Sequence, residues 1–163
     1  MTSIRPADRL LDAIERGGAV DIQPLLKYYN GDDTDIILRA TARRSNFEAF
    51  KLVIDYIRNR TSITQHGSEA LCVACTYGYT DKVKYLLQLG LNASCIDNKP
   101  IIHASYYGHM QVVELLIEKG ADEKCAHPRA IVHLNRKRIV TLLLASVPRL
   151  AQCQLFTHPL YER

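Results

Sequence analysis

The sequence predicts an all-α solenoid of about five stacked helix-turn-helix units, and three observations carry that prediction. Two segments, residues 69–92 and 99–122, superimpose at a spacing of 30 residues, which pairs Ala74 with Ala104, Gly78 with Gly108 and Gly90 with Gly120. Apolar residues within each segment recur at helical spacing. The flanking segments keep the same order in degenerate form. A fixed period between about 20 and 50 residues is typical of stacked repeats.

Each central unit is predicted to hold two short helices. The first helix, around residues 70–77 or 100–107, carries small residues on one side, which let neighbouring helices approach closely: Ala74 and Cys75, then Ala104 and Ser105. A glycine at 78 or 108 then breaks the helix and turns the chain. The second helix has valines and leucines at helical spacing and ends at a glycine, 90 or 120, that suits a left-handed C-terminal cap.

One repeat follows a pattern that fixes many positions over a full period. Residues 104–122 match A-x-x-x-G-H-x-x-V-V-x-L-L-x-x-x-G-A-D almost completely, and residues 74–92 match it in weaker form. This pattern resembles the ankyrin repeat. The usual Thr-Pro-Leu-His opening is replaced by EALC at 69–72 and KPII at 99–102, so we expect a softer array. The short period also implies short hairpin loops, in the style of repeats from large DNA viruses or microbial effectors.

The array is predicted to cover residues 1–146, in units at about 6–30, 34–60, 67–93, 97–123 and 127–146. In the last unit the first helix is short, and Asn135 stands where the turn glycine would be. Residues 147–163 are predicted to form a short helix around 149–156 and a tail, because Pro148 and Pro159 interrupt the segment. The favoured role of this segment is to cap the last unit, and the alternative is a docking peptide.

Composition narrows the class of protein. Of the 163 residues, 47% are hydrophobic and 23% charged, as in a soluble globular protein. The opening segment lacks the apolar core of a secretory signal, and no apolar run reaches the roughly 20 residues that cross a bilayer. Five scattered cysteines indicate reduced thiols inside a cell. We therefore expect a cytoplasmic protein, in the host-cell cytoplasm or nucleus if the source is viral, and no membrane partner.

The resemblance implies that the two residues before each turn glycine point into a concave face. The sequence pairs at these positions are Glu15-Arg16, Arg43-Arg44, Thr76-Tyr77, Tyr106-Tyr107 and His133-Leu134. Tyrosine and arginine are enriched at binding hot spots. The candidate partner-binding residues are therefore Arg43, Arg44, Tyr77, Tyr106 and Tyr107. The alternative is that one tyrosine of each pair packs over the adjacent unit and is partly buried.

The predicted function is non-catalytic binding of another protein, because no motif of an active site or phosphate loop occurs. We interpret His109 as scaffold and His103 as packed. A second hypothesis is a nucleic-acid or phosphate-binding module, which would use the basic cluster Arg136, Lys137 and Arg138 together with Arg39, Arg43 and Arg44. A third is a scaffold that assembles with itself into homo-oligomers.

Cys72 and Cys75 lie one helical turn apart, as half of a zinc site would. No second ligand pair follows at the right spacing, so buried thiols are the favoured interpretation. We expect no metal and no cofactor.

Overall fold

The structure is a computed structural model, and it describes residues 5–16, 19–31 and 33–146. The described residues contain helices and no strand, which confirms the all-α prediction. The helices are α1 (Pro6–Arg16), α2 (Ala19–Leu26), α3 (Thr34–Arg43), α4 (Phe47–Arg58), α5 (Ile63–Thr76), α6 (Thr80–Gln88), α7 (Cys95–Tyr106), α8 (Met110–Glu118), the 3-10 helix η1 (Glu123–Cys125) and α9 (Pro128–Ser146).

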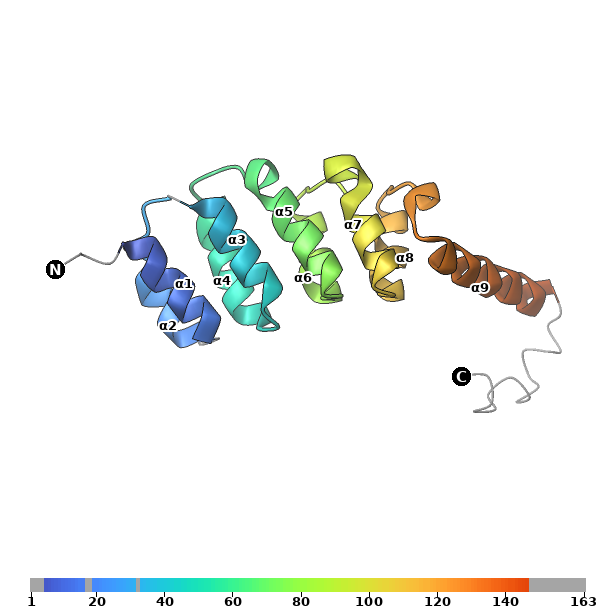
Figure 1. The fold of residues 1–163 in the computed structure, drawn as a ribbon, viewed down its shortest axis with the longest axis horizontal. Helices are drawn as coiled ribbons and strands as arrows, with labels where there is room; N and C mark the ends of the chain where they lie inside the picture. Colours follow the sequence, from blue (N-terminus) through green and yellow to red (C-terminus); the bar gives the residue numbers. More distant parts are fainter. Residues whose placement is uncertain (1–4, 17–18, 32, 147–163) are drawn as a thin grey trace.

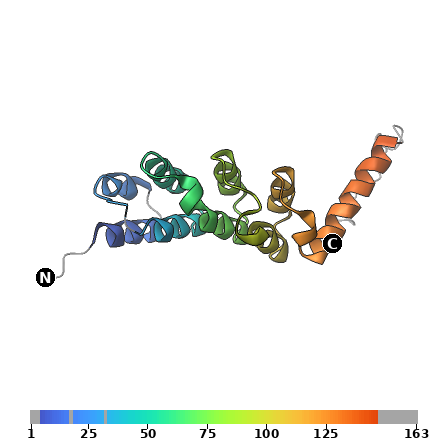
Figure 2. The same cartoon turned by 90° about the horizontal axis from the view of Figure 1, so that it is seen from above.

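Four helical pairs stack side by side, and α9 follows at the end of the stack (Figure 1). Helices α1, α3, α5 and α7 pack on one another and form the inner layer, whereas α2, α4, α6 and α8 form the outer layer (Figure 2). The apolar core lies between the two layers, with side chains such as Leu10, Phe50 and Leu86 fully buried. The small residues Ala74 and Ala104 are fully buried too, as expected where inner helices approach closely.

The turn glycine of the third pair makes room for a contact between units. Gly78 has a φ of +71°, which side chains rarely tolerate, and a Cβ added to it would lie 2.4 Å from Nδ1 of His109. His109 comes from the next pair, and its Nε2 donates to the backbone carbonyl of Thr76 at 2.9 Å. This carbonyl belongs to the last turn of α5, where helical partners run out. His109 therefore acts as a C-terminal cap for α5.

A buried lysine makes the equivalent contact one unit earlier. The Lys82 side chain is almost fully buried, and its Nζ donates to the carbonyl of Thr41 at 2.7 Å and to the carbonyl of Arg44. These carbonyls lie at the C-terminal end of α3. The Phe50 and Tyr79 ring centres are 4.7 and 5.0 Å from the same amine. Burial lowers the pKa of the Lys82 amine to about 8. Two carbonyls and two rings thus offset its loss of hydration.

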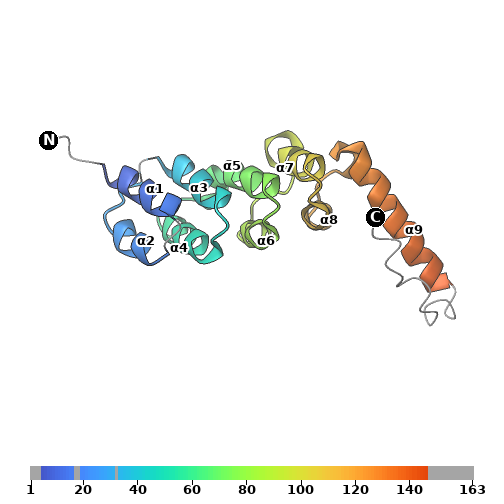
Figure 3. The same ribbon diagram turned by 60° about the horizontal axis from the view of Figure 1, so that its bottom comes forward.

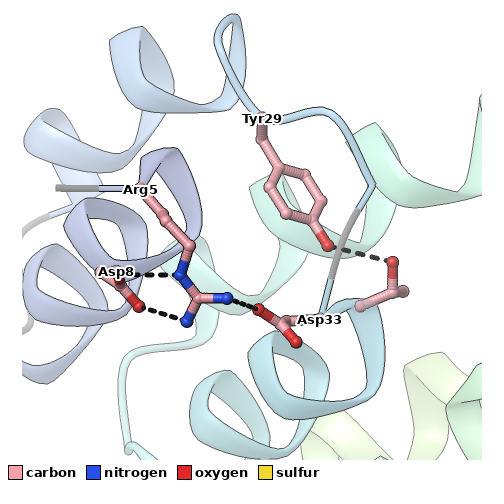
Figure 4. Close-up of polar contacts among 5 residues, drawn as sticks. Arg5, Asp8, Tyr29 and Asp33 are labelled. Carbon is pink, nitrogen blue, oxygen red and sulfur yellow. Dashed lines mark hydrogen bonds and ion pairs between the residues drawn. The ribbon is translucent and has the colours of Figure 1, made fainter. Parts of the chain in front are cut away.

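Polar contacts tie the first helix to the second pair (Figure 4). The Arg5 guanidinium, just before α1, donates to the carboxylate of Asp8 at 3.0 and 3.2 Å and to that of Asp33 at 3.3 Å. The hydroxyls of Tyr29 and Thr34 lie 3.0 Å apart and form a buried hydrogen bond. These contacts fix the start of α3 against the first pair.

Two links between pairs differ from the expected hairpins. Helix α5 begins at Ile63, well before the expected start near residue 70, because Ile63 and Gly67 are buried in the core and extend the helix. Before the regular part of α7, the residues Ile96, Asp97 and Asn98 all have left-handed backbone, with φ of 49°, 53° and 61°. Such residues cost about 1–2 kcal/mol each. The short period therefore produces a tight, strained link into α7.

The last unit differs most from its prediction. Residues 128–146 form one continuous helix, α9, in place of two short helices around Asn135. The physical reason is the missing glycine: Gly78 and Gly108 turn the chain with φ of +71° and +79°, whereas Asn135 continues as helix. The predicted capping helix and tail at 147–163 lie outside the described residues.

The Gly78 turn gives a matched pair of stability predictions. Gly78→Ala should lower the free energy of unfolding by about 2–4 kcal/mol, because it adds both backbone strain and loss of the His109 cap. Gly108 has a similar positive φ of +79°, but nothing lies within 4 Å of a Cβ added to it. Gly108→Ala should cost only about 1 kcal/mol. Urea unfolding of both variants measures the difference, and equal losses would contradict the role given to His109.

The Lys82 amine predicts a pH dependence of stability. The folded chain loses this proton near pH 8, whereas the unfolded chain keeps it until near the ordinary value of 10.5. Because the unfolded state binds more protons in that window, stability should rise from pH 8 to 10.5 relative to Lys82→Met. Burial raises the pKa of Tyr85 to about 12. Because Tyr85 is present in both the wild-type and the Lys82→Met chain, its contribution to the pH dependence cancels in the comparison. Urea unfolding at both pH values tests this, and parallel profiles would contradict it.

Lys82→Met itself should lower the free energy of unfolding at pH 7 by about 1–3 kcal/mol. Methionine keeps the length of the side chain but leaves the carbonyls of Thr41 and Arg44 without their lysine donor. Lys84→Met on the same helix is the matched control, because Lys84 is exposed. A Lys82→Met chain as stable as that control would show that the amine contributes nothing to the stack.

Candidate functional site

Large apolar side chains are exposed on two parts of the molecule. Among the described residues, the outer helices α4, α6 and α8 expose none of them, and Tyr28 after α2 stands apart. Five lie on the inner helices or the turns that follow them, namely Ile36, Tyr77, Ile102, Tyr106 and Tyr107. Four lie on α9, namely Val132, Ile139, Val140 and Leu142. The inner layer and α9 are therefore the two candidate surfaces.

A hollow of about 460 Å³ opens on the inner layer across α1, α3 and α5. We call it the α3 hollow, since α3 supplies half of its lining residues, which are Leu11, Glu15, Ile36, Arg39, Ala40, Arg43, Val73 and Tyr77. Arg43 lies 3.8 Å from the Glu15 carboxylate, and the Arg39 Nε donates to the Asp35 carbonyl at 3.3 Å. The hollow thus combines apolar walls with two arginines and one acid.

A second hollow, of about 510 Å³, lies between the end of α7 and the start of α9. We call it the α7 hollow, and its lining includes Tyr106, Tyr107, His127, Arg129 and His133. The Tyr106 ring meets the Tyr107 ring edge-on at 5.1 Å and the His127 ring at 6.0 Å. Nearby, Nδ1 of His103 forms a hydrogen bond of 2.9 Å with the Thr76 hydroxyl, so His103 is engaged in packing between units.

The structure brings some of the predicted contact residues together and separates others. Tyr77, Tyr106 and Tyr107 are 48%, 69% and 57% exposed, so none of the three is buried over a neighbouring unit. Arg43 and Tyr77 share the α3 hollow, and Tyr106 and Tyr107 share the α7 hollow. Arg44 is exposed but lines neither, and its carbonyl accepts from Lys82.

The sequence analysis did not predict that two isoleucines of the inner layer are exposed. Ile36 and Ile102 each stand beside a second isoleucine, Ile37 or Ile101, that is fully buried. In a helix, adjacent residues point about 100° apart, so one member of each pair must leave the core. The doubled isoleucines were the available signal, but helical spacing alone does not decide which member faces outward.

The basic cluster is divided between faces of α9. The Lys137 amine lies 2.7 Å from the Glu114 carboxylate, and the Arg138 guanidinium lies 2.8 Å from that of Glu123. Arg136 is exposed on another side. Internal acids thus neutralise two of the three charges, which weakens the cluster as a phosphate-binding patch.

The four cysteines in the described part of the chain are buried or half-buried thiols. Cys72 and Cys75 are buried in α5, and burial raises the pKa of the Cys75 thiol. A hydrogen bond with Cys95 raises the pKa of Cys72 and lowers that of Cys95 to about 7. Over the described ranges, no three His, Cys, Asp or Glu side chains gather in a way that could hold a metal ion. In the same residues, no helix has the length and apolar character to span a bilayer.

Comparison with known proteins identifies the architecture. A family model described as ankyrin repeats (3 copies) matches residues 37–127, more than half of the chain. The match runs from within α3 to the residue before α9. No curated protein matches the chain. Ankyrin repeats generally mediate protein–protein interactions, and domains built from them are typically non-catalytic binding modules. Its stacked helical pairs, turn glycines and family match together place the chain in the ankyrin-repeat family.

Proposed function

We propose that this chain is a non-catalytic module that binds a partner protein through its inner layer, with Arg43, Arg44, Tyr77, Tyr106 and Tyr107 as contact residues. One observation supports the proposal above others: large apolar side chains are exposed along the inner layer, whereas α4, α6 and α8 expose none. Exposed apolar side chains gathered on one face favour a protein interface.

The chemistry of the inner layer favours a partner with apolar anchors and acidic groups. Tyrosine offers a large, rigid contact area with a polar tip, and it loses little conformational entropy on binding. In the α3 hollow, Arg43 has only a long contact with Glu15, and both side chains are about half exposed. A partner carboxylate could replace that contact with a closer, bidentate one. Ile36 would add apolar area inside the α3 hollow, and Ile102 of α7 would add a further exposed apolar side chain of the inner layer.

The nucleic-acid or phosphate alternative is less well supported. It needs the arginines of α3 and the basic cluster of α9 to act together, and these lie in different parts of the array (Figure 1). Lys137 and Arg138 already pair with acids of the chain itself. The self-assembly alternative predicts a mass in solution that rises with concentration. The salt dependence of the affinity distinguishes protein binding from phosphate binding. Phosphate binding weakens steeply between low and moderate ionic strength, whereas a protein interface anchored by tyrosines weakens much less.

Replacing all five proposed contact residues by alanine should abolish partner capture and leave the fold intact. Each side chain is exposed, so the variant should keep its helical circular dichroism signal and unfold at nearly the same urea concentration. The loss follows because interface tyrosines and arginines each contribute about 2 kcal/mol or more at hot spots. A photo-crosslinking residue at position 102 on α7, compared with one at 84 on α6, measures capture directly in both the wild-type chain and the variant.

The matched control replaces exposed residues outside the inner layer and outside α9: Tyr28, Lys51, Arg58, Lys84 and Lys119. This control variant should capture the same protein as the wild-type chain, with and without nuclease. If the inner-layer variant still captures it, or if nuclease abolishes capture, the proposed function is wrong.

A further inference from the structure

Helix α9 has two faces with different surroundings. Ala130 and Leu134 are buried, and they lie on the face that packs toward α7 and α8. Lys137 and Arg138 pair with Glu114 of α8 and Glu123 of η1. These contacts hold α9 against the end of the array, from which the rest of the helix extends (Figure 3). Among the described residues, those on the opposite face of α9 are exposed.

That open face carries an apolar stripe. Val132, Arg136 and Ile139 fall at positions i, i+4 and i+7, which lie above one another on a helix. Val132 and Ile139 are 60% and 58% exposed. Leu142, at i+3 from Ile139, is 69% exposed and borders the stripe on the side toward α8, where it lines a hollow with Glu114 and Ile117. Val140 flanks the stripe on the other side, and it is exposed as well. We call these five residues the α9 stripe. Their spacing is that of a helix prepared to pack against another helix.

The charge on this face is entirely positive. Helix α9 contains no Asp or Glu, and its basic residues are Arg129, Arg136, Lys137 and Arg138. Lys137 and Arg138 face the array and have acidic partners there. The guanidinium groups of Arg129 and Arg136 form no ion pair with any described residue, and they lie beside the exposed valines and isoleucine. An apolar stripe next to unpaired arginines complements an apolar stripe next to acids.

We propose that the α9 stripe docks an acidic amphipathic helix of a partner protein. The apolar side chains of that helix would cover Val132, Ile139 and Leu142, and its Glu or Asp side chains would pair with Arg129 and Arg136. Arg129 also lines the α7 hollow, but the site lies outside the family match and contains none of the five contact residues proposed above. It therefore does not depend on the function proposed above.

Other occupants fit the charges less well. A second copy packed antiparallel about the middle of α9 would place Arg136 beside Arg136 of the copy, and like charges repel. Residues 147–163 contain one acid, Glu162, against two arginines, so the chain's own tail offers little complementary charge. An anionic membrane would match the charge. Helices that lie in membrane interfaces use Trp, Phe or Leu on the apolar face, and α9 has leucines but no Trp or Phe, so binding to anionic vesicles is one outcome that the test must distinguish.

The probe for this site is a fluorescein-labelled 18-residue peptide with leucines at i, i+3, i+4 and i+7 and glutamates on both flanks. Fluorescence anisotropy with the full chain should give a Kd at least about tenfold lower than for the same peptide with lysines replacing the glutamates. Ile139→Ser should raise the Kd for the glutamate peptide about tenfold, because it removes an apolar anchor. Arg136→Glu should raise that Kd similarly and lower the Kd for the lysine peptide.

Lys51→Glu on α4 makes the same charge change at an exposed site away from α9, so it should alter the Kd less than about twofold. A paired Tyr106→Ala and Tyr107→Ala chain should also bind the peptide as the wild type does. Circular dichroism checks that each variant is folded. Arg136→Glu remains informative even if Ile139→Ser disturbs the helix. The Arg136 side chain is exposed, so replacing it removes no contact with the apolar core.

Several outcomes would overturn the proposal. One is an equal Kd for the glutamate peptide and the lysine peptide. Another is an equal Kd of the wild-type chain and Arg136→Glu for the glutamate peptide. Another is binding to phosphatidylserine vesicles, lost in Arg136→Glu, without binding to the glutamate peptide. A doubled mass that Ile139→Ser abolishes would assign the stripe to a second copy. If replacing Leu150 and Phe156 by serine tightened peptide binding about tenfold, the chain's own tail would be the occupant.

Discussion

Side chains from one unit cap the inner helix of the unit before it, and these contacts define both the scaffold and its surface. Lys82 donates to the carbonyls at the end of α3, and His109 donates to the end of α5. A buried polar group left without its hydrogen-bond partner costs about 1–3 kcal/mol of stability. This is a large share of the about 5–15 kcal/mol by which a domain is stable. The carbonyl groups involved adjoin the proposed contact residues Arg43, Arg44 and Tyr77. The backbone that presents those side chains to a partner is therefore held rigid by the next unit, which lowers the entropy lost on binding.

No Lys82- or His109-type cap from a described residue follows at the end of α7, where the last helix of the array, α9, begins after a different contact. There the Ser105 hydroxyl accepts from the backbone N–H of His127 at 2.8 Å, so the segment after α8 is still attached to the array. Beyond this point no glycine turns the chain at residue 135, and the helix continues to Ser146. A helix-turn-helix unit would have packed its second helix on α8 and hidden apolar residues in the outer layer. A continuous helix packs on the array along one face only, and Val132, Ile139 and Val140 remain exposed.

Much of the fold was predictable because glycine and alanine have few alternative explanations at a fixed spacing. Gly78 and Gly108 have positive φ and end their helices, and Ala74 and Ala104 are buried where inner helices meet. Features that depend on three-dimensional partners were not predictable. The burial of Lys82 depends on carbonyl groups about 40 positions earlier in the chain, and a lysine on an amphipathic helix ordinarily indicates solvent. The outward orientation of Ile36 and Ile102 depends on how the inner helices rotate against one another. For the candidate site, the repeat register predicted the positions of the aromatic residues. Their division between two hollows depends on how the helices pack, which the register does not give.

The two proposed surfaces differ in chemistry and meet at Arg129, which lines the α7 hollow and is also proposed to pair with an acid of a helix docked on α9. The α3 hollow holds arginines together with Glu15, whereas the α9 stripe is purely basic and apolar. Val132, Arg136 and Ile139 lie opposite the face of α9 that packs on the array, whereas Leu142 borders α8. A helix docked on the stripe would leave the α3 hollow open. Two partners held on one rigid array would meet at an effective concentration of order millimolar, which converts their encounter into an intramolecular event. A rigid spacer is effective in this role only if it resists bending, and the caps between units supply that resistance. If both proposed surfaces bind partners, an adaptor role would depend on the Lys82 and His109 caps as much as on the surfaces themselves.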